Sequence, residues 1–447
     1  MNHDIQFQPD LGVSGWLGVL PGRSPSAALE ADIEADYCIV GAGFAGLSAA
    51  RRILQLDSNA SVVILEASAV ASGPAGRNSG FMIDLPHLLS SSSYAGQADS
   101  DQRDIRLNRN AIEFVRNRVT EYGLPEEVFR AEGKINAAVS QSGLSANQAY
   151  AEHLNNLGEA CELLSSSDMQ RIAGTDYYVG GLQTPGTAMI QPAMLIQGFA
   201  DGLADNPRVS LFERSAVDSL EKQSNRWKVS TAKGSVLATK TILAVNGFIE
   251  RFGFYQHRLM HINLYASMTR ALSEDEVCRL GGDARWGFTP SDPFGSTVRR
   301  ISDTGGDRLI IRNHFSYDPS LAPKASRLVQ ASRDHDEAFK ARFPMLADVA
   351  MEYRWSGRLC LSRNHVWALG EVADQLYSAC CQNGLGTTKG VVAGIVAAEM
   401  ACEHSDESLM PDFRQQDLPQ KLFPEPFMTI GAKTYLKIRE WRAGKDK

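Results

Sequence analysis

A glycine-rich turn near residue 40 limits the folds open to this chain more than any other sequence feature. Residues 41–46 read Gly-Ala-Gly-Phe-Ala-Gly. They directly follow the apolar run 36–40 and lead into the segment 44–56, whose apolar residues recur at helical spacing. A second, β-branched run follows at 61–65. Strand, glycine turn, helix and strand in this order predict a βαβ unit of the kind that binds a dinucleotide.

Each position of the turn has its own physical role. Gly41 permits the tight turn, Gly43 lets the backbone approach a pyrophosphate, and Gly46 lets the helix lie close on the strand. The helix starts at Phe44 and Ala45, where free backbone N–H groups face the anion. Side chains at the three glycines would obstruct these contacts, so the turn predicts a pyrophosphate site.

An acidic residue stands at the end of the second strand. Glu66 follows Gly46 by 20 residues, which is the position where a carboxylate accepts hydrogen bonds from the ribose hydroxyls of an adenosine. The same carboxylate would repel a 2′-phosphate, so NADP is disfavoured. We expect Glu66 and the adjacent Ala67 to bind the adenosine part of the cofactor.

Composition and charge exclude several classes of protein. The 447 residues suffice for two or more domains, and 43% hydrophobic with 22% charged residues is typical of a globular protein. With 45 Lys and Arg against 52 Asp and Glu, the net charge of −7 offers no basic face to nucleic acid. The seven cysteines are scattered, with no CxxC pair and no zinc-site spacing, which favours a reducing compartment and predicts no metal. Because no signal-peptide or membrane-span pattern is found, we expect a cytoplasmic protein.

The remaining chain alternates helices with short strands. Residues 1–30 show no periodicity and are expected to be an irregular lead-in. Helices are expected at 100–122 and 387–402, and a glycine-rich turn should join the second helix to a strand at 365–370. Further strands are expected at 209–212, 227–231, 240–245, 263–270, 297–301 and 308–312. Mixed strands after a βαβ opening favour an α/β fold with an added antiparallel domain.

Several separated motifs resemble those of one family, in that family's order. Residues 70–80, Val-Ala-Ser-Gly-Pro-Ala-Gly-Arg-Asn-Ser-Gly, resemble the GASGRNGG segment that follows the ribose-binding acid in FAD-dependent amine oxidoreductases of the D-amino-acid oxidase superfamily. Within that superfamily the chain is most similar to the gamma-glutamylputrescine oxidoreductase group. Other similar motifs lie at 190–195, 215–217, 241–247, 355–358 and 381–388.

The resemblance implies a two-domain architecture. It consists of a Rossmann-like FAD-binding domain of the glutathione-reductase type and an interleaved α+β substrate domain built on a mainly antiparallel sheet. The FAD-binding domain is expected to be discontinuous, at 30–95, 166–250 and 352–425. The substrate domain is expected at 96–165 and 251–351, with a lead-in at 1–29 and a C-terminal helix at 426–447.

The resemblance also implies which residues hold FAD. In the family the segment 70–80 runs along the ribityl chain to the isoalloxazine ring, and backbone N–H groups of the turn 384–388 face the N1/O2 edge of the flavin. Leu385 replaces the family's histidine, so no side-chain charge is supplied there. Cys360 lies near, but not on, the site of covalent attachment in related sarcosine oxidases, so we expect noncovalent FAD. The additional FAD-binding residues predicted in this way are Gly76, Arg77, Asn78, Ser79, Gly80, Val217, Asn246, Gly247, Gly357, Gly384, Leu385, Gly386, Thr387 and Thr388.

The implied reaction is the oxidation of a C–N bond in a secondary or gamma-glutamylated amine. Flavin N5 accepts a hydride from the carbon next to nitrogen, and the imine is hydrolysed to a carbonyl and an amine. The amine must react in its neutral form, and the candidates for handling its proton are His87, Tyr265, His261 and His314. A substrate carboxylate calls for a bidentate guanidinium, for which the candidates are Arg299, Arg300 and Arg312.

Other functions stay open at this point. The same fold serves D-amino-acid, glycine-like and 2-hydroxy-acid oxidoreductases, and a protein that binds FAD without turnover is a remote alternative. A NAD-dependent dehydrogenase is disfavoured, because only one dinucleotide fingerprint is present.

Two features bear on the electron acceptor and on partners. No lysine occurs between Lys240 and Lys324, the region that supplies an oxygen-activating lysine in the sarcosine-oxidase relatives, so the acceptor is either oxygen or a quinone or other carrier. The C-terminal segment is basic and contains Ile430, Tyr435, Leu436 and Ile438. A solvated helix is favoured there, with peripheral contact to anionic lipid as the alternative.

Overall fold

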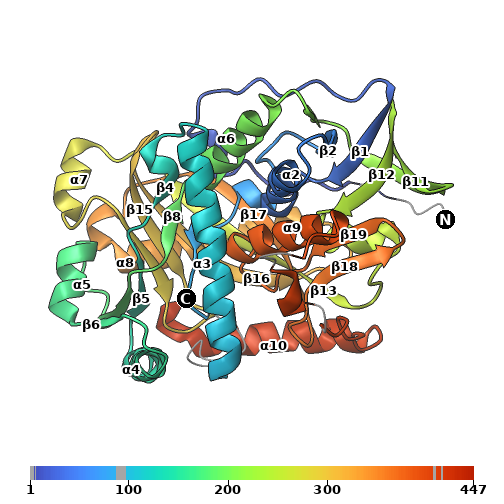
Figure 1. The fold of residues 1–447 in the computed structure, drawn as a ribbon. Coiled ribbons are helices and arrows are strands. Elements are labelled where there is room, and N and C mark those ends of the chain that lie inside the picture. The colour runs from blue at the N-terminus through green and yellow to red at the C-terminus, as the bar shows by residue number, and fades with distance from the viewer. Residues whose placement is uncertain (1–4, 6, 87–96, 406–408, 414–415) are drawn as a thin grey trace.

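In the computed structural model, which describes residues 5, 7–86, 97–405, 409–413 and 416–447, two large sheets are surrounded by helices (Figure 1). The first sheet has the order β10-β11-β12-β1-β2-β9, with β19 also beside β12 and β18 beside β19. Its strands are β1 (Asp32–Val40), β2 (Val62–Leu65), β9 (Val209–Phe212), β10 (Val217–Gln223), β11 (Arg226–Thr231), β12 (Ser235–Leu243), β18 (Ala368–Ala373) and β19 (Leu376–Cys380). The central pairs, β1 with β2 and with β12, are parallel, as the βαβ opening requires.

The second sheet is mainly antiparallel and has the order β17-β13-β16-β15-β14-β5-β7-β6. Only β14 and β5 pair in parallel among its described neighbours. The strands are β5 (Lys134–Ala138), β6 (Glu162–Leu164), β7 (Gly180–Thr184), β13 (Leu259–Thr269), β14 (Trp286–Pro290), β15 (Thr297–Asp303), β16 (Gly306–Tyr317) and β17 (Met351–Ser362). A third, small sheet consists of β3 (Phe81–Met82), β8 (Ala188–Ile190) and β4 (Phe129–Arg130).

Helices cover both sheets (Figure 1). They are α1 (Gly15–Gly18), α2 (Phe44–Leu56), α3 (Ala98–Glu121), α4 (Gln141–Asn156), α5 (Ser166–Ala173), α6 (Pro192–Ala204), α7 (Glu274–Leu280), α8 (Ala325–Arg342), α9 (Thr388–Ala401) and α10 (Phe427–Ala443). In Figure 1, α10 runs along the base of the molecule, where it packs on β16.

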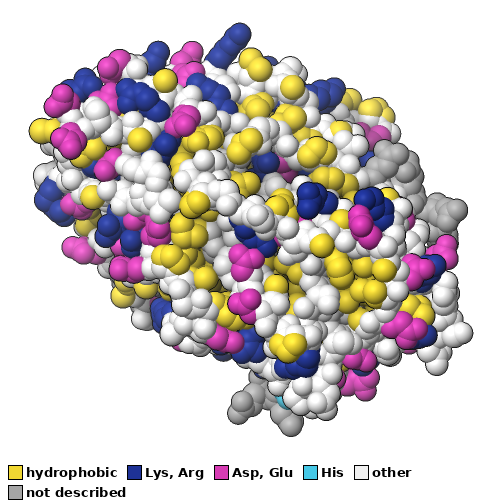
Figure 2. All heavy atoms as spheres, turned by 90° about the horizontal axis from the view of Figure 1, so that it is seen from above, with side chains coloured by type: hydrophobic (Ala, Val, Ile, Leu, Met, Phe, Trp, Pro, Cys, Tyr) yellow, Lys and Arg dark blue, Asp and Glu magenta, His cyan; other side chains and the backbone are white. Residues whose placement is uncertain are grey.

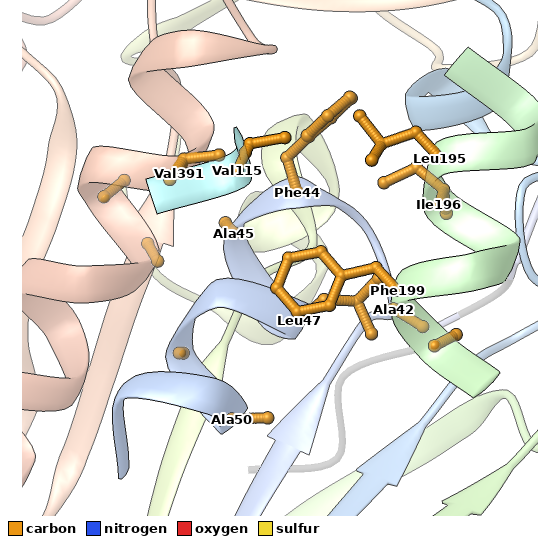
Figure 3. Close-up of a cluster of buried hydrophobic side chains, with 14 of the residues drawn as sticks. Ala42, Phe44, Ala45, Leu47, Ala50, Val115, Leu195, Ile196, Phe199 and Val391 are labelled. Atoms are coloured by element: carbon orange, nitrogen blue, oxygen red, sulfur yellow. The ribbon is translucent and has the colours of Figure 1, made fainter. Parts of the chain in front are cut away.

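The largest apolar core fixes α2 between α6 and α9 (Figure 3). Leu47 of α2 faces Phe199 of α6, while α9 approaches the other side of α2. A Cβ at Gly394 of α9 would lie 2.1 Å from the Ala45 carbonyl oxygen, so the two helix backbones meet directly. This packing brings the N-termini of α2 and α9 to one edge of the first sheet.

The predicted α/β class and the predicted elements are confirmed within a few residues, with α2 spanning 44–56 as expected. Two expectations were wrong. The strand near 368 does not pass through a glycine turn directly to α9, because β19 lies between them and pairs with β18 and β12. The lead-in is not wholly irregular, because it contains α1, whose Trp16 is buried against the main core.

Two segments lie in a different sheet from the one that the predicted domain division implies. β7 falls within 166–250 and β17 overlaps 352–425, both assigned to the FAD-binding domain, yet both strands belong to the second sheet. Pairing of β7 with β5 and β6, and of β17 with β13, places them there. Such pairing joins segments far apart in sequence, so composition along the chain does not reveal it.

Candidate cofactor and substrate site

A cavity of about 480 Å³ runs between the two sheets and past the N-termini of α2 and α9. Most of the predicted cofactor residues line it: Gly41, Gly43, Phe44, Ala45, Glu66, Ala67, Arg77, Asn78, Ser79, Val217, Asn246, Gly247, Gly357, Gly384, Leu385, Gly386 and Thr387. Gly46, Gly76, Gly80 and Thr388 are adjacent in sequence to this wall but are not part of it. One cavity therefore collects residues from seven separated stretches of the chain.

The three glycines of the first turn differ in what a side chain would meet. Gly41 has φ of 106°, and a Cβ there would lie 2.6 Å from the Ala244 carbonyl oxygen. A Cβ at Gly46 would lie 1.8 Å from the Gly41 carbonyl oxygen. At Gly43, by contrast, the nearest atom is the Ala75 Cβ at an ordinary 3.5 Å. The fold thus requires Gly41 and Gly46, whereas Gly43 leaves open space on the cavity side, where a pyrophosphate can approach.

Glu66, which the sequence predicts to bind the adenosine, lines the cavity next to the first glycine turn. Its Oε2 accepts a hydrogen bond from the Ala42 N–H at 3.0 Å, and its Oε1 accepts one from the Ser68 N–H at 3.1 Å. Burial raises the pKa of this carboxyl, while the backbone N–H groups oppose the rise. Each oxygen keeps a lone pair for a ribose hydroxyl, and Val217 lines the same cavity.

The segment 70–80 is held rigidly by its own polar groups. The Arg77 guanidinium donates to the carbonyl oxygens of Leu11 and Ser356, both at 3.1 Å. The Asn78 amide donates to the Ala75 carbonyl at 2.6 Å and accepts from the Gly80 N–H at 2.8 Å. Arg77 and Asn78 therefore shape the cavity wall through the backbone.

The turn before α9 leaves polar groups at the other end of the cavity. The Thr387 hydroxyl donates to the Phe81 carbonyl at 2.7 Å, and a Cβ at Gly386 would meet nothing within 4 Å. The buried side-chain oxygen of Asn246, which lines the cavity, has no hydrogen-bond partner among the described residues. Because buried polar atoms are normally paired, this oxygen and the free N–H groups of the helix start fit a polar ligand such as a flavin edge. Burial raises the pKa of the Cys360 thiol, which also lines the cavity.

Three of the predicted substrate-handling residues also line this cavity: Arg312, Tyr265 and His261. Arg312 of β16 donates from Nε to the Ser79 hydroxyl at 3.2 Å, and its guanidinium lies 5.7 Å from the Phe315 ring centre. The Tyr265 hydroxyl of β13 is 2.7 Å from the Ser316 hydroxyl, and burial raises the pKa of Tyr265. Arg312 thus connects the second sheet with the cofactor segment, residues 70–80, which the sequence predicts to bind FAD.

The histidine candidates separate into different environments. His261 lines the cavity, its Nε2 is 2.5 Å from Glu250 Oε2, and its Nδ1 has no partner among the described residues. His314 faces Asp334 and Glu440 outside the cavity wall, at 3.2 and 3.7 Å, and burial lowers its pKa. His87 lies outside the described residues.

Two of the three arginine candidates lie outside the cavity wall. Arg299 is buried away from the cavity and donates to the carbonyl oxygens of Gly80 and Ile190 at 2.9 and 2.8 Å. Arg300 donates to the Asp283 carbonyl and pairs with Asp307 at 3.3 Å. Neither Arg299 nor Arg300 lines the cavity, and Arg312 is the one of the three that does.

The sequence analysis missed a buried ion pair in the cavity wall. Asp10 of the lead-in and Arg358 of β17 both line the cavity, with Asp10 Oδ1 2.9 Å from Arg358 Nε. Burial raises the pKa of Asp10, and the two nearby arginines, Arg358 and Arg77, counteract the rise. The lead-in carries no periodic pattern, so no local signal places Asp10 beside Arg358.

A buried lysine of β5 provides a test of the electrostatics beside the site. Lys134 donates to Asn136 Oδ1 and, at 3.2 Å, to the hydroxyl of Thr289, which lines the cavity. Burial lowers the pKa of Lys134 from 10.5 to about 8. The unfolded chain therefore binds more protons between these pH values, so this lysine's contribution to stability is present above about 10.5 and lost as pH falls through about 8.

We expect Lys134→Met to flatten the pH dependence of stability between pH 7 and pH 10. The shift from 10.5 to about 8 corresponds to about 3 kcal/mol in the free energy of unfolding. Urea unfolding at both pH values measures it. Lys340→Met, at an exposed position of α8, serves as the control and should keep the original dependence. An unchanged pH dependence in Lys134→Met would contradict the assignment.

Residues 36–400 match the family described as FAD dependent oxidoreductase. Gamma-glutamylputrescine oxidoreductase of Escherichia coli (strain K12) is 25% identical over 439 residues, which cover 93% of this chain and 95% of that protein. The crystal structure of glycine oxidase from Geobacillus kaustophilus matches with a TM-score of 0.69 at 15% identity, covering 88% of this chain and 100% of the other.

A further solved structure, iminodiacetate oxidase from Chelativorans sp. BNC1, matches with a TM-score of 0.65 at 16% identity and covers 84% of this chain and 98% of the other. At these identities the structural matches establish the fold. Among the described residues, no helix combines the length and apolar character needed to cross a membrane.

Proposed function

We propose that this chain, which belongs to the family of FAD-dependent oxidoreductases, oxidises a C–N bond of a secondary or gamma-glutamylated amine that carries a carboxylate. Family membership makes it an enzyme that uses FAD. The observation that carries the substrate proposal is Arg312, a guanidinium in the cavity wall that reaches Ser79 of the cofactor segment. A guanidinium binds a carboxylate through two parallel hydrogen bonds, so it can orient an acidic amine.

The names of similar proteins support this substrate class. Gamma-glutamylputrescine and iminodiacetate both contain an amine together with carboxylate groups, and glycine is the smallest amino acid. Iminodiacetate is itself a secondary amine. The common chemistry is an amine and a carboxylate in one molecule, which a single arginine in the cavity wall would select.

Bound FAD would accept a hydride from the carbon next to nitrogen. The protein's residues hold the substrate and manage its proton. Tyr265, whose pKa is raised by burial, stays a neutral phenol and can hydrogen-bond the amine without acting as a base. We assign proton acceptance to His261, because it lines the cavity and Glu250 orients its ring. Apolar walls that include Leu264 and Trp355 exclude water.

The electron acceptor and the compartment are part of the same proposal. No lysine lies among the described residues of the cavity wall, which leaves a quinone or other carrier as the alternative to oxygen. Hydrogen peroxide formed in equal amount with product would identify oxygen. All seven cysteines are free, which favours the cytoplasm as a reducing compartment.

An anaerobic flavin-bleaching experiment tests the proposed function. The purified yellow protein is mixed without oxygen with gamma-glutamylputrescine, iminodiacetate, N-alkyl amines that lack a carboxylate, D-amino acids and 2-hydroxy acids. We expect the amines that carry a carboxylate to bleach the flavin absorbance, and the amines without a carboxylate to bleach it far more slowly. Bleaching by 2-hydroxy acids alone would overturn the amine proposal. Flavin that none of these compounds reduces would support a binding protein without turnover.

A further inference from the structure

We infer that helix α10 docks the protein on an anionic lipid bilayer through an exposed apolar stripe with basic residues on its flanks. The inference is independent of the substrate. It rests on where exposed apolar side chains gather, which face of α10 is anchored, and how charge is distributed.

Exposed large apolar side chains concentrate in one part of the described chain. Of the twelve such residues, seven lie between 418 and 441: Leu418, Phe423, Phe427, Ile430, Tyr435, Ile438 and Trp441. On α10, Phe427 is 71%, Ile430 60%, Ile438 44% and Trp441 80% exposed. At 100° per residue these four fall within an arc of about 80°, which makes one continuous stripe along the helix. A contiguous apolar stripe on a water-exposed helix indicates an interaction site.

The opposite face of α10 is fixed to the second sheet. Glu440 Oε1 accepts a hydrogen bond from the Phe315 N–H of β16 at 2.8 Å, and the Arg439 guanidinium lies 4.8 Å from the Phe294 ring centre. Ala443 is buried at the end of the helix. The stripe therefore points outward from a docked helix and needs no unfolding to reach a partner. Because Phe315 lines the cavity, docking would also bring the substrate part of the cavity near the bound surface.

The basic residues around the stripe favour an anionic partner. Residues 427–447 carry six basic and two acidic side chains in a chain whose net charge is −7. Of these, Lys433, Lys437, Arg442 and Lys445 are exposed. On the face opposite α10, by contrast, basic and acidic side chains are interspersed (Figure 2). An apolar stripe flanked by cations matches the interface of an anionic bilayer, where lysine and arginine meet lipid phosphates and tryptophan sits at headgroup level.

A second copy of the chain fits this surface less well. Pairing two α10 stripes would bring the flanking cations of both copies together, and like charges in contact oppose association. The bilayer is therefore the occupant that both the apolar and the charged side chains favour.

Trp441 provides a direct probe of docking. The other five tryptophans, Trp16, Trp227, Trp286, Trp355 and Trp367, are buried, whereas Trp441 is 80% exposed. The full-length holoprotein is mixed with vesicles of phosphatidylglycerol and phosphatidylcholine, or of phosphatidylcholine alone. We expect a blue shift of the emission and quenching by brominated lipid with the anionic vesicles only. The Trp441→Phe variant should lose both signals but should still cosediment with the anionic vesicles.

Surface variants separate the two parts of the mechanism. Lys433→Glu combined with Lys437→Glu should lower cosedimentation with anionic vesicles roughly tenfold or more, because each cation contributes separately to binding. Phe427→Ser with Ile438→Ser should do the same by removing apolar area. Matched controls are Arg171→Glu, whose side chain is 66% exposed on α5, and Leu163→Ser, which is 52% exposed on β6. Both controls should bind as the unmodified protein does.

Three results would overturn the inference. The first is that the protein does not cosediment with anionic vesicles at low salt. The second is that it binds neutral vesicles as well as anionic ones, and that the charge-reversed variant binds as well as the unmodified protein. The third is that light scattering shows a dimer that depends on Phe427 and Ile438, while vesicles are not bound. The last result would assign the stripe to a second copy. Binding that falls as salt rises from about 0.1 to 0.5 M agrees with the electrostatic part, because salt screens surface charges.

Discussion

Gly43→Leu is expected to give a folded, colourless protein. The backbone at Gly43 has φ of −93°, which any residue adopts, and its Cβ would make only an ordinary contact with Ala75 at 3.5 Å. The rest of a leucine side chain would extend into the cavity where the pyrophosphate is proposed to lie. Loss of about two hydrogen bonds to a charged group costs about 3 kcal/mol, which weakens FAD binding at least roughly hundredfold.

Fluorescence titration of the apoprotein with FAD measures this loss, and a circular dichroism melt checks the fold. Replacing a glycine N-cap by leucine costs about 1 kcal/mol, so the apoprotein should remain folded. Gly22→Leu, at an exposed glycine with nothing within 4 Å of its Cβ, should bind FAD normally. Gly46→Leu should fail to fold, because its Cβ would collide with the Gly41 carbonyl. Unchanged FAD affinity in Gly43→Leu would remove the pyrophosphate from this turn.

Local sequence signals predicted the elements that depend on neighbours in the chain. The glycine turn, helix α2 and the acidic Glu66 follow from spacing alone, because one βαβ unit needs glycines at the turn and apolar residues at helical intervals. The strand pairs β1 with β12 and β13 with β17 join residues far apart in sequence. Many segments have suitable apolar patterns, so the sequence offers no reason to choose one pairing over another.

The arginines illustrate where side-chain direction escapes the sequence. In a half-buried strand, alternating polarity shows which side chains face the core. Residues 297–301 of β15, which include Arg299 and Arg300, are all buried, so both faces of the strand are covered and no alternation identifies the cavity side. The direction of each guanidinium became clear only from the carbonyl oxygens to which it donates.

A β-bulge explains why Arg312 lines the cavity and His314 does not, although they lie two residues apart on one strand. In the register between β13 and β16, Leu264 pairs with Phe315 and Tyr265 with Asn313, so His314 is the extra residue. Its φ of 63° fits this position. The bulge turns His314 toward Asp334 and Glu440 and brings Phe315 to the cavity with Arg312. Nothing in the sequence Arg-Asn-His-Phe announces such a bulge.

The proposed role of Arg312 leads to the second large expected effect. Arg312→Met should lower kcat/KM for a carboxylated amine roughly 150-fold, which corresponds to a rise of about 3 kcal/mol in the activation free energy. The reason is that removing one partner of a desolvated ion pair costs about 2–5 kcal/mol. Oxidation of an N-alkyl amine without a carboxylate should change little, since that substrate presents no partner for the guanidinium. Steady-state kinetics with both amines on the same FAD-loaded variant measures the difference, and the amine without a carboxylate serves as an internal control.

Two further variants distinguish substrate binding from a structural role of the same side chain. Arg312→Lys should recover only part of the lost activity, because an ammonium keeps the charge but not the bidentate geometry of a guanidinium. Arg171→Met, at an exposed position on α5, should behave like the unmodified enzyme. If Arg312→Met lost activity equally toward both amines, the contact of Arg312 with Ser79 would be supporting the cofactor segment, and the carboxylate site would have to be sought elsewhere in the cavity. A loss confined to the acidic amine would instead tie substrate selection to a single cation that β16 directs into the cavity.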